Sequence, residues 1–379
     1  MKKTLTIIAL FLLILGAGSY GLLAEEEILI GANYELTGNV ALFGQACLNS
    51  ARLAVDEINA AGGLLGKKVK LVAADNKSIA EEAGNMAQKL ISQDRVVAIV
   101  GPVTSSDCLA AGPVAQNKGV PMITPTGTNP KVTEVGSFIF RACFIDDFQG
   151  EVMAKFALKN LKAKKAALMI ETSSDYAKGL ASFFKKAFTK GGGTIVAEEG
   201  FMTEDKDFRA TLNKIRLKDP DVIFLPSYYN QDGLIAKQAR EMGMKMPILG
   251  GDGWDQVEEL PKVAGKAALN NIFFSNHFSP ESDDPLAIKY VKAYKERFGK
   301  NPDALAALGY DAIRLIFDSI KRANSTNPDK IRAAMAATKG FKGVAGVITM
   351  DANRNPIKSA VIIELVDGVQ KYKTTIEPD

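Results

Sequence analysis

Regular alternation of short apolar runs with longer helical patterns is the feature that most constrains how this chain can fold. The first apolar runs are EILIGAN, KVKLVAAD and VVAIVGP, and a stretch with helical periodicity follows each of them. Strands that alternate with helices form parallel sheets covered by helices on both faces. The sequence therefore predicts an α/β fold whose functional loops lie at the carboxyl ends of the strands.

The alternation occurs in two successive sets. The first set ends at VPMIT, and the second begins after Asp147. Two sets of similar size predict two Rossmann-like lobes, a hinge near residues 146–148 and one ligand cleft between the lobes. The expected helices of the second set cover residues 148–160, 175–190, 205–217 and 230–242. A helix-rich stretch over residues 284–337 and two late strands, around residues 345–350 and 358–366, complete the chain.

The N-terminal residues 1–24 have the order of segments that is typical of a secretory signal peptide. Lys2 and Lys3 precede the apolar run TLTIIALFLLIL, which is followed by the small residues GAGS. A membrane helix is the alternative, because residues 4–24 carry no charge and approach the ~20 residues that a bilayer requires. The small residues favour cleavage, after Ser19 or Ala24, and hence a protein exported to the periplasm.

The charge balance and the cysteines of the mature chain limit its possible partners and disulfides. Without Lys2 and Lys3, 45 of the 47 basic side chains remain against 43 acidic ones, so a nucleic-acid partner has little support. The cysteines Cys47, Cys108 and Cys143 are odd in number. Their spacing is compatible with one disulfide plus one free thiol, and equally with three buried thiols.

Catalytic motifs are incomplete throughout the sequence. His277 is the single histidine and no G-x-S-x-G motif occurs, so a Ser–His triad has little basis. Ser182 and Lys185 fit S-x-x-K but lie within a helical pattern. The segment AAGGLLGKK departs from a P-loop, and the loop at Asp351 has Pro356 where a calcium loop needs glycine. We expect no enzyme activity, no cofactor and no metal ion.

Hydroxyl side chains follow two neighbouring strands of the first set. Thr104, Ser105 and Ser106 follow VVAIVGP after one valine, and MITPTGTNP contributes Thr126 and Thr128. One of the serines could simply cap the helix that follows. Two strand ends that both offer hydroxyls and backbone N–H groups near a helix N-terminus favour a carboxylate site instead.

Aromatic and acidic side chains follow the strands of the second set. Tyr176, Tyr228 and Tyr229 each come after a strand, and Asp252 and Trp254 follow a third one. Tyrosines of a buried core and a turn aspartate are the alternative interpretation. Together with the hydroxyl cluster, however, an acid among aromatic rings is what an amino-acid zwitterion requires.

In the order and spacing of these segments, the chain resembles the leucine/isoleucine/valine-binding family, the solute-binding proteins of branched-chain amino-acid ABC transporters. The resemblance rests on LTGNVALFGQACLNSARLAVDEINAAGG, VGPVTSSD, MITPTGTNP, the DY of SSDYAKG, DPDVIFLPSYYNQDG and GDGW. It implies a type I periplasmic-binding fold, with two lobes joined by three crossing strands that close around a buried ligand. The implied lobes are residues 25–146 plus 275–352 and residues 147–274 plus 353–379.

The resemblance also implies roles for single residues. Ser105 and Thr128 would bind the ligand carboxylate. Asp252 and the main chain of Thr126 would hold the ammonium. The remaining pocket residues would be Phe43, Val103, Thr104, Gly127, Tyr176, Tyr228 and Trp254.

Three differences from the family pattern leave the preferred ligand side chain open. Phe43 stands where a tyrosine is common, Asp252 replaces a glutamate, and Thr126 with Gly127 replaces two alanines. The expected ligand is leucine, isoleucine or valine, with another amino acid, an amide or a small carboxylate as alternatives. The expected partner of this monomer is a membrane ABC permease, and a ligand-sensing receptor is the alternative.

Overall fold

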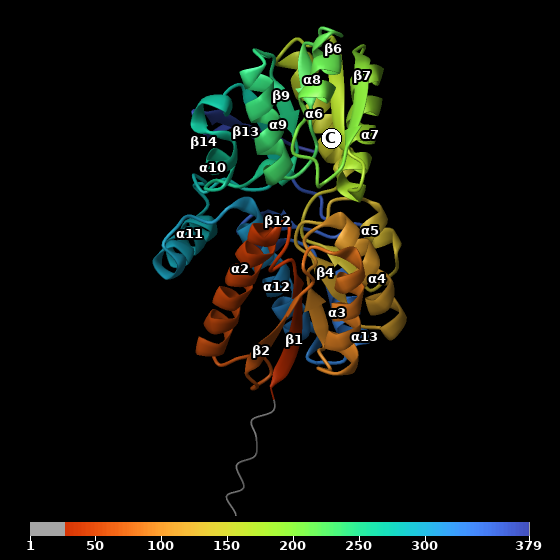
Figure 1. Ribbon diagram of the computed structural model, residues 1–379. Coiled ribbons are helices and arrows are strands. Elements are labelled where there is room, and N and C mark those ends of the chain that lie inside the picture. The colour runs from red at the N-terminus through yellow and green to blue at the C-terminus, as the bar shows by residue number, and fades with distance from the viewer. Residues whose placement is uncertain (1–26, 379) are drawn as a thin grey trace, which may run out of the picture.

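The computed structural model describes residues 27–378. They form two lobes, one above the other in Figure 1, and each lobe is built on one large sheet. The predicted signal peptide and its cleavage sites lie outside these residues. Within residues 27–378, none of the helices combines the length and the apolar character needed to cross a bilayer. The predicted α/β class with parallel-core sheets is confirmed.

The first lobe is built on a five-stranded parallel sheet in the order β2-β1-β3-β4-β5. Its strands are β1 (Ile28–Tyr34), β2 (Val69–Asp75), β3 (Ala98–Val100), β4 (Met122–Thr124) and β5 (Ile139–Arg141). Its helices are α2 (Ala41–Ala60), α3 (Ala80–Ser92), α4 (Ser105–Lys118), α5 (Lys131–Glu134), α11 (Pro285–Phe298), α12 (Ala304–Ala323) and α13 (Pro328–Ala336). The long α12 packs against α2, which brings the late helices back to the first lobe.

The second lobe is built on a seven-stranded sheet in the order β14-β13-β10-β9-β8-β6-β7. Its strands are β6 (Lys165–Glu171), β7 (Thr194–Phe201), β8 (Val222–Phe224), β9 (Ile248–Gly250), β10 (Ile272–Asn276), β13 (Ala360–Val366) and β14 (Val369–Ile376). Only β13 and β14 pair antiparallel, and they extend one edge of a parallel core. Its helices are α6 (Asp146–Lys159), α7 (Asp175–Lys190), α8 (Arg209–Arg216), α9 (Tyr229–Glu241) and α10 (Leu260–Ala264), with the short 3-10 helix η1 (Asp252–Trp254) and η2 (Lys266–Ala268).

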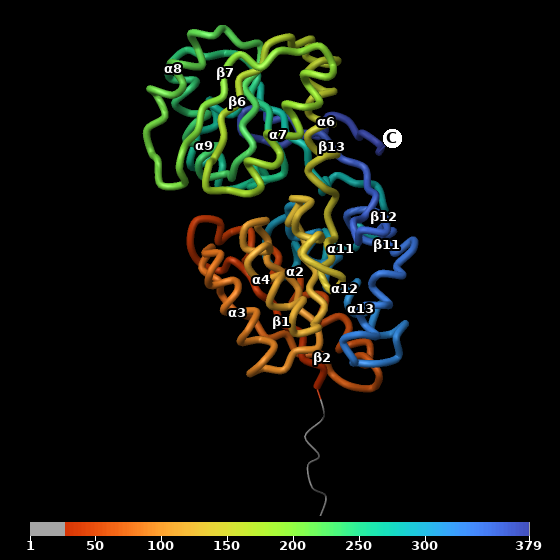
Figure 2. Tube along the Cα trace, turned by 90° about the vertical axis from the view of Figure 1, so that its right-hand side faces the viewer, coloured from red at the N-terminus to blue at the C-terminus, as the bar shows by residue number. Residues whose placement is uncertain are grey.

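The chain passes between the lobes in three segments on one side of the molecule (Figure 2). They join β5 to α6, β10 to α11, and the small hairpin of β11 (Phe341–Gly343) and β12 (Gly346–Ile348) to β13. The predicted hinge at residues 146–148 lies at the first turn of α6. Three connections on one side leave the opposite side of the two lobes free to approach and separate.

Local sequence explains where two helices of the first lobe, α4 and α12, begin. Thr104 caps α4 through its hydroxyl, which accepts the backbone N–H of Asp107 at 3.3 Å. Asp303 caps α12 in the same way, by accepting the backbone N–H of Ala306. Such caps satisfy donors that have no partner within a helix, so each helix begins at a fixed residue beside the cleft.

Candidate functional site

A cavity lies between the lobes, where strands of both sheets end. Eight of the residues expected at the site line it, namely Phe43, Val103, Thr104, Ser105, Thr126, Tyr176, Tyr228 and Asp252. Gly253 and Leu305 complete the lining. Both lobes therefore contribute to one cavity.

The first lobe presents the N-terminus of α4 to this cavity. Ser105 is the first residue of the helix, and its hydroxyl accepts the backbone N–H of Asn129 at 3.2 Å. Among the described residues, no acceptor meets the backbone N–H of Ser105 or Ser106. Free N–H groups at the positive end of a helix dipole favour an anion.

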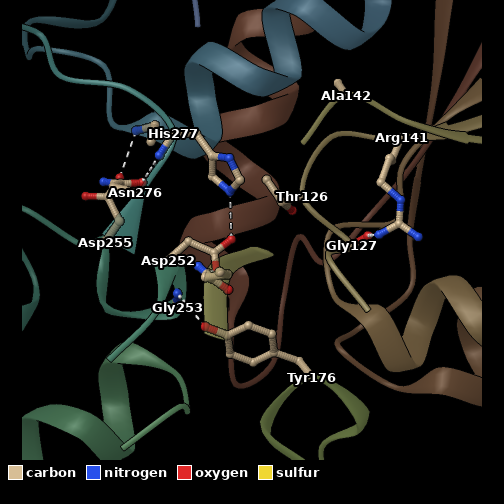
Figure 3. A network of polar contacts seen from close by, with 12 residues as sticks. Thr126, Gly127, Arg141, Ala142, Tyr176, Asp252, Gly253, Asp255, Asn276 and His277 are labelled. Carbon is tan, nitrogen blue, oxygen red and sulfur yellow. Dashed lines mark hydrogen bonds and ion pairs between the residues drawn. The ribbon is translucent and has the colours of Figure 1, made fainter. Parts of the chain in front are cut away.

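The loop after β4 lies beside that helix terminus and is fixed by its own side chains. Thr126 donates its hydroxyl to the carbonyl of Val103 at 2.8 Å, and Thr124 accepts the N–H of Gly127 at 2.8 Å. Arg141, fully buried at the end of β5, donates to the carbonyls of Gly127 and Asn129 (Figure 3). The cavity wall of the first lobe is thus held in place before any ligand arrives.

Two buried acids, Glu35 and Asp107, lie behind this wall, and Glu35 fixes its backbone. Glu35 accepts the N–H groups of Val103 at 3.1 Å and Thr104 at 2.9 Å. Burial and the neighbouring charge of Glu35 raise the pKa of Asp107 to about 9. Asp107 therefore keeps its proton at neutral pH, so the two acids do not repel each other.

The second lobe presents Asp252, whose carboxylate is held from two sides. Gln149 of α6 donates to Oδ1 at 3.0 Å, and Nε2 of His277 lies 3.0 Å from Oδ2 (Figure 3). Asp252 and His277 are both about 5 % exposed. A buried carboxylate that lines a cavity is the counter-charge that an ammonium group requires.

Aromatic rings form the apolar part of the cavity. Tyr176 and Tyr228 stack with their centroids 5.4 Å apart, and Phe43 of the first lobe meets Tyr228 edge-on at 6.0 Å. The hydroxyl of Tyr176 accepts the N–H of Gly253 at 3.2 Å. A Cβ at Gly253 would lie 2.1 Å from the carbonyl oxygen of Ser227, so only glycine allows this approach.

Three of the predicted residues do not line the cavity. Thr128 is buried, and its hydroxyl has no hydrogen-bond partner within the described residues. Gly127 lies in the loop held by Arg141. Trp254 is fully buried, and its Nε1 donates to the carbonyl of Leu225 at 2.9 Å. Sequence reasoning missed Leu305, on α12, which no nearby motif indicates.

The three cysteines are free thiols in the structure, and all are buried. Within residues 27–378, no group of three or more His, Cys, Asp or Glu side chains has a metal-binding arrangement.

Direct hydrogen bonds join the two lobes at the rim of the cavity. Ser106 on α4 donates to Oδ2 of Asp175 on α7 and accepts the backbone N–H of the same residue, both at 3.1 Å. Asn129 donates to the carbonyl of Asp175 at 2.8 Å. These bonds exist only when the lobes are together, so they stabilise the closed form.

Replacing Ser106 by alanine is therefore expected to shift the population toward the open form and weaken ligand binding by about three- to tenfold, the value of one or two hydrogen bonds. Small-angle X-ray scattering without ligand should show a larger radius of gyration, and calorimetry should show the weaker binding. Ser173→Ala is the matched control, because Ser173 bonds Thr203 within one lobe. Equal affinities in the two variants would contradict the role of Ser106.

The structure has two hinged lobes and, between them, a cavity with an anion site on one side and an acid on the other. These features define a solute-binding protein. Residues 27–369 match the family model described as periplasmic binding protein. The Leu/Ile/Val-binding protein BraC3 of Rhizobium johnstonii is 34% identical over 336 residues, which cover 86% of this chain and 88% of the relative.

Two solved structures agree with this match. The leucine-binding protein LivK of Thermotoga maritima has 38% identity and a TM-score of 0.89, and covers 93% of this chain and 99% of its own. The second structure is LivJ of Streptococcus pneumoniae, a branched-chain amino-acid transporter substrate-binding protein in complex with isoleucine. It has 38% identity and a TM-score of 0.87, and the match covers 93% of this chain and 100% of LivJ. The chain belongs to the periplasmic binding protein family. The resemblance to Leu/Ile/Val-binding proteins and the type I fold predicted from the sequence are confirmed.

Proposed function

We propose that this protein captures an aliphatic α-amino acid, namely leucine, isoleucine or valine, between its lobes and delivers it unchanged to an ABC permease. The observation that carries the proposal is the placement of opposite charges across one cavity. The α4 N-terminus with Ser105 faces it from the first lobe, and Asp252 faces it from the second. An α-amino acid carries both charges on neighbouring atoms, and the aromatic rings suit its side chain.

The ligand contacts are proposed from the same geometry. Ser105, the free N–H groups of α4 and Thr128 bind the carboxylate, while Asp252 and the carbonyl of Thr126 bind the ammonium. Thr128 would act from behind the cavity wall, where its buried hydroxyl has no other partner within the described residues. The similarity to LivJ, which binds isoleucine, supports an aliphatic side chain against Phe43 and Leu305.

Ligand binding would favour the closed form, because only there do both lobes contact the same solute. We propose residues 25–146 plus 275–352 and residues 147–274 plus 353–379 as the two moving units. The protein would act as a monomer in the periplasm after cleavage of residues 1–24, and its closed form would be the one that the permease recognises.

A thermal-shift screen of the mature protein against the common amino acids and small carboxylates tests this function. We expect leucine, isoleucine or valine, at a concentration about 100-fold above its dissociation constant, to raise the Tm by at least ~3 °C. Aspartate, lysine and benzoate serve as controls. A shift with one of the controls and none with the aliphatic amino acids would contradict the proposal.

A further inference from the structure

His277, the single histidine of the chain, lies directly after β10, where one of the three connecting segments begins. Its imidazole is fully buried, and Nε2 lies 3.0 Å from Oδ2 of Asp252 (Figure 3). Phe144 of another connecting segment stacks on the ring, with the centroids 3.7 Å apart. The ring is therefore held against the acid that faces the cavity, although it does not line the cavity itself.

The surroundings of the ring define its protonation state. An ionised carboxylate only accepts hydrogen bonds, so Nε2 carries the hydrogen that it donates to Asp252. Nδ1 is buried and meets no partner among the described residues. A second proton on Nδ1 would therefore have no acceptor, and burial lowers the pKa of His277 below its usual 6.5. The ring is neutral at pH 7.

The neutral ring and Gln149 together orient the carboxylate. Each oxygen of Asp252 accepts one hydrogen bond from the protein, Oδ1 from Gln149 and Oδ2 from His277. A carboxylate oxygen has two lone-pair directions, so one on each atom remains for a ligand. Both protein donors are uncharged, which leaves the full negative charge of Asp252 for the ammonium.

We propose that His277 is a positioning residue that makes amino-acid binding sensitive to pH: its neutral ring orients Asp252 toward the ligand ammonium, and its protonated ring competes with that ammonium for the same carboxylate. This inference rests on the proposed function and concerns the same site. It assigns to the hinge a proton-dependent control of ligand release.

The direction of the effect follows from linkage. The ligand ammonium disfavours a second positive charge beside Asp252, so the pKa of His277 must be lower in the complex than in the free protein. Affinity is then constant above the pKa of the free protein and falls as the pH drops through it, by at most about tenfold per pH unit. Binding of the ligand and of the proton to this site are thus antagonistic.

Other ionisable groups face the same region, so the wild-type protein alone does not isolate His277. Asp255 raises the pKa of His277 and the buried Lys358 lowers it, both less than burial does. Asp146 on α6 interacts with Asp252, and its pKa is raised well above the usual value by burial. Burial and Asp255 raise the pKa of Asp303 to about 7. Variants that change only His277 remove its share of the pH dependence and keep that of these groups.

Nuclear magnetic resonance of the wild-type protein is the first test, because a single histidine gives one set of imidazole signals. We expect an Nε2–H tautomer, a pKa below 6.5 in the free protein and a further decrease when leucine, isoleucine or valine is added. A pKa that stays the same on addition of a ligand that binds would overturn the inference. This measurement needs no variant, so it decides the matter even where a variant does not fold.

Calorimetry between pH 5 and pH 8 is the second test, on the wild-type protein, His277→Gln and His277→Asn. Neither amide titrates in this range; glutamine can reach Asp252 as Nε2 does, and asparagine is too short. One pH unit below the pKa that the resonance titration gives for His277 in the free protein, wild-type affinity is expected to have fallen at least about fivefold more than that of either variant. At pH 7.5, His277→Gln should keep more of the affinity than His277→Asn.

The possible failures can be told apart. A wild-type protein that binds none of the three amino acids at pH 7.5 would overturn the proposed function and this inference with it. A wild-type protein that binds them, with the same pH dependence as His277→Gln, would overturn this inference alone.

Discussion

Replacing Asp252 by asparagine is expected to weaken the binding of leucine, isoleucine or valine at least ~100-fold, the effect of leaving a buried ammonium without its counter-charge. Asparagine keeps the size of the side chain, but its amide carries no charge, and its NH₂ group would face the donors of Gln149 or His277. Isothermal titration calorimetry at pH 7.5 measures the effect directly. We expect the fold to be retained, because the site lies at the edge of the second lobe.

Asp232→Asn is the matched control for this variant. Asp232 is also a buried acid of the second lobe; it is bonded to Ser227 and does not itself line the cavity. Burial raises its pKa well above the usual value, so the surroundings of Asp232 already disfavour the charge that an amide removes. Affinity near the wild-type value is expected for this control. If Asp252→Asn also bound like the wild-type protein, the ammonium site would be wrongly assigned.

Replacing Arg141 by leucine is expected to lower the free energy of unfolding by about 3 to 5 kcal/mol. The guanidinium is fully buried and donates to the carbonyls of Gly127, Asn129 and Pro130, and to the hydroxyl of Thr133. Leucine would leave these acceptors buried without donors. The same loop forms the cavity wall, so ligand binding should weaken together with the fold.

Denaturant unfolding of this variant is best compared with Arg52→Leu. Arg52 is an exposed arginine on α2, and a surface substitution of this kind changes the stability by no more than ~0.5 kcal/mol. A similar midpoint for both variants would show that the loop after β4 does not depend on Arg141.

Most elements of the fold could be predicted, because each apolar run and each helical pattern carries a local signal. The pattern predicts a helix over residues 175–190, and α7 spans Asp175–Lys190 with Ser174 as its N-cap. The helix predicted over residues 205–217 begins only at Arg209, since Asp205 instead closes a turn with Met202. Strand β14 was not predicted, because its exposed side chains form no apolar run, although Asp367 and Gly368 mark the hairpin turn.

The residues that line the cavity could be predicted only in part. Ser105, Thr126 and Asp252 follow strands, and the ends of parallel strands meet at one edge, so their proximity follows from the topology. Leu305 comes from a helix late in the chain. The contact of His277 with Asp252 depends on how the connecting segment packs against η1, and no local pattern encodes it.

Calorimetry with wild-type protein and two truncated forms of leucine tests the central claim most directly, because neither lobe is altered. 4-Methylpentanoate lacks the ammonium and should lose the contact with Asp252. 3-Methylbutylamine lacks the carboxylate and should lose the contacts with Ser105 and the N-terminus of α4. We expect each compound to bind at least ~100-fold more weakly than leucine, since each leaves one buried group unpaired. Binding of either compound as tightly as leucine would contradict the claim that the two lobes grip opposite charges of one solute.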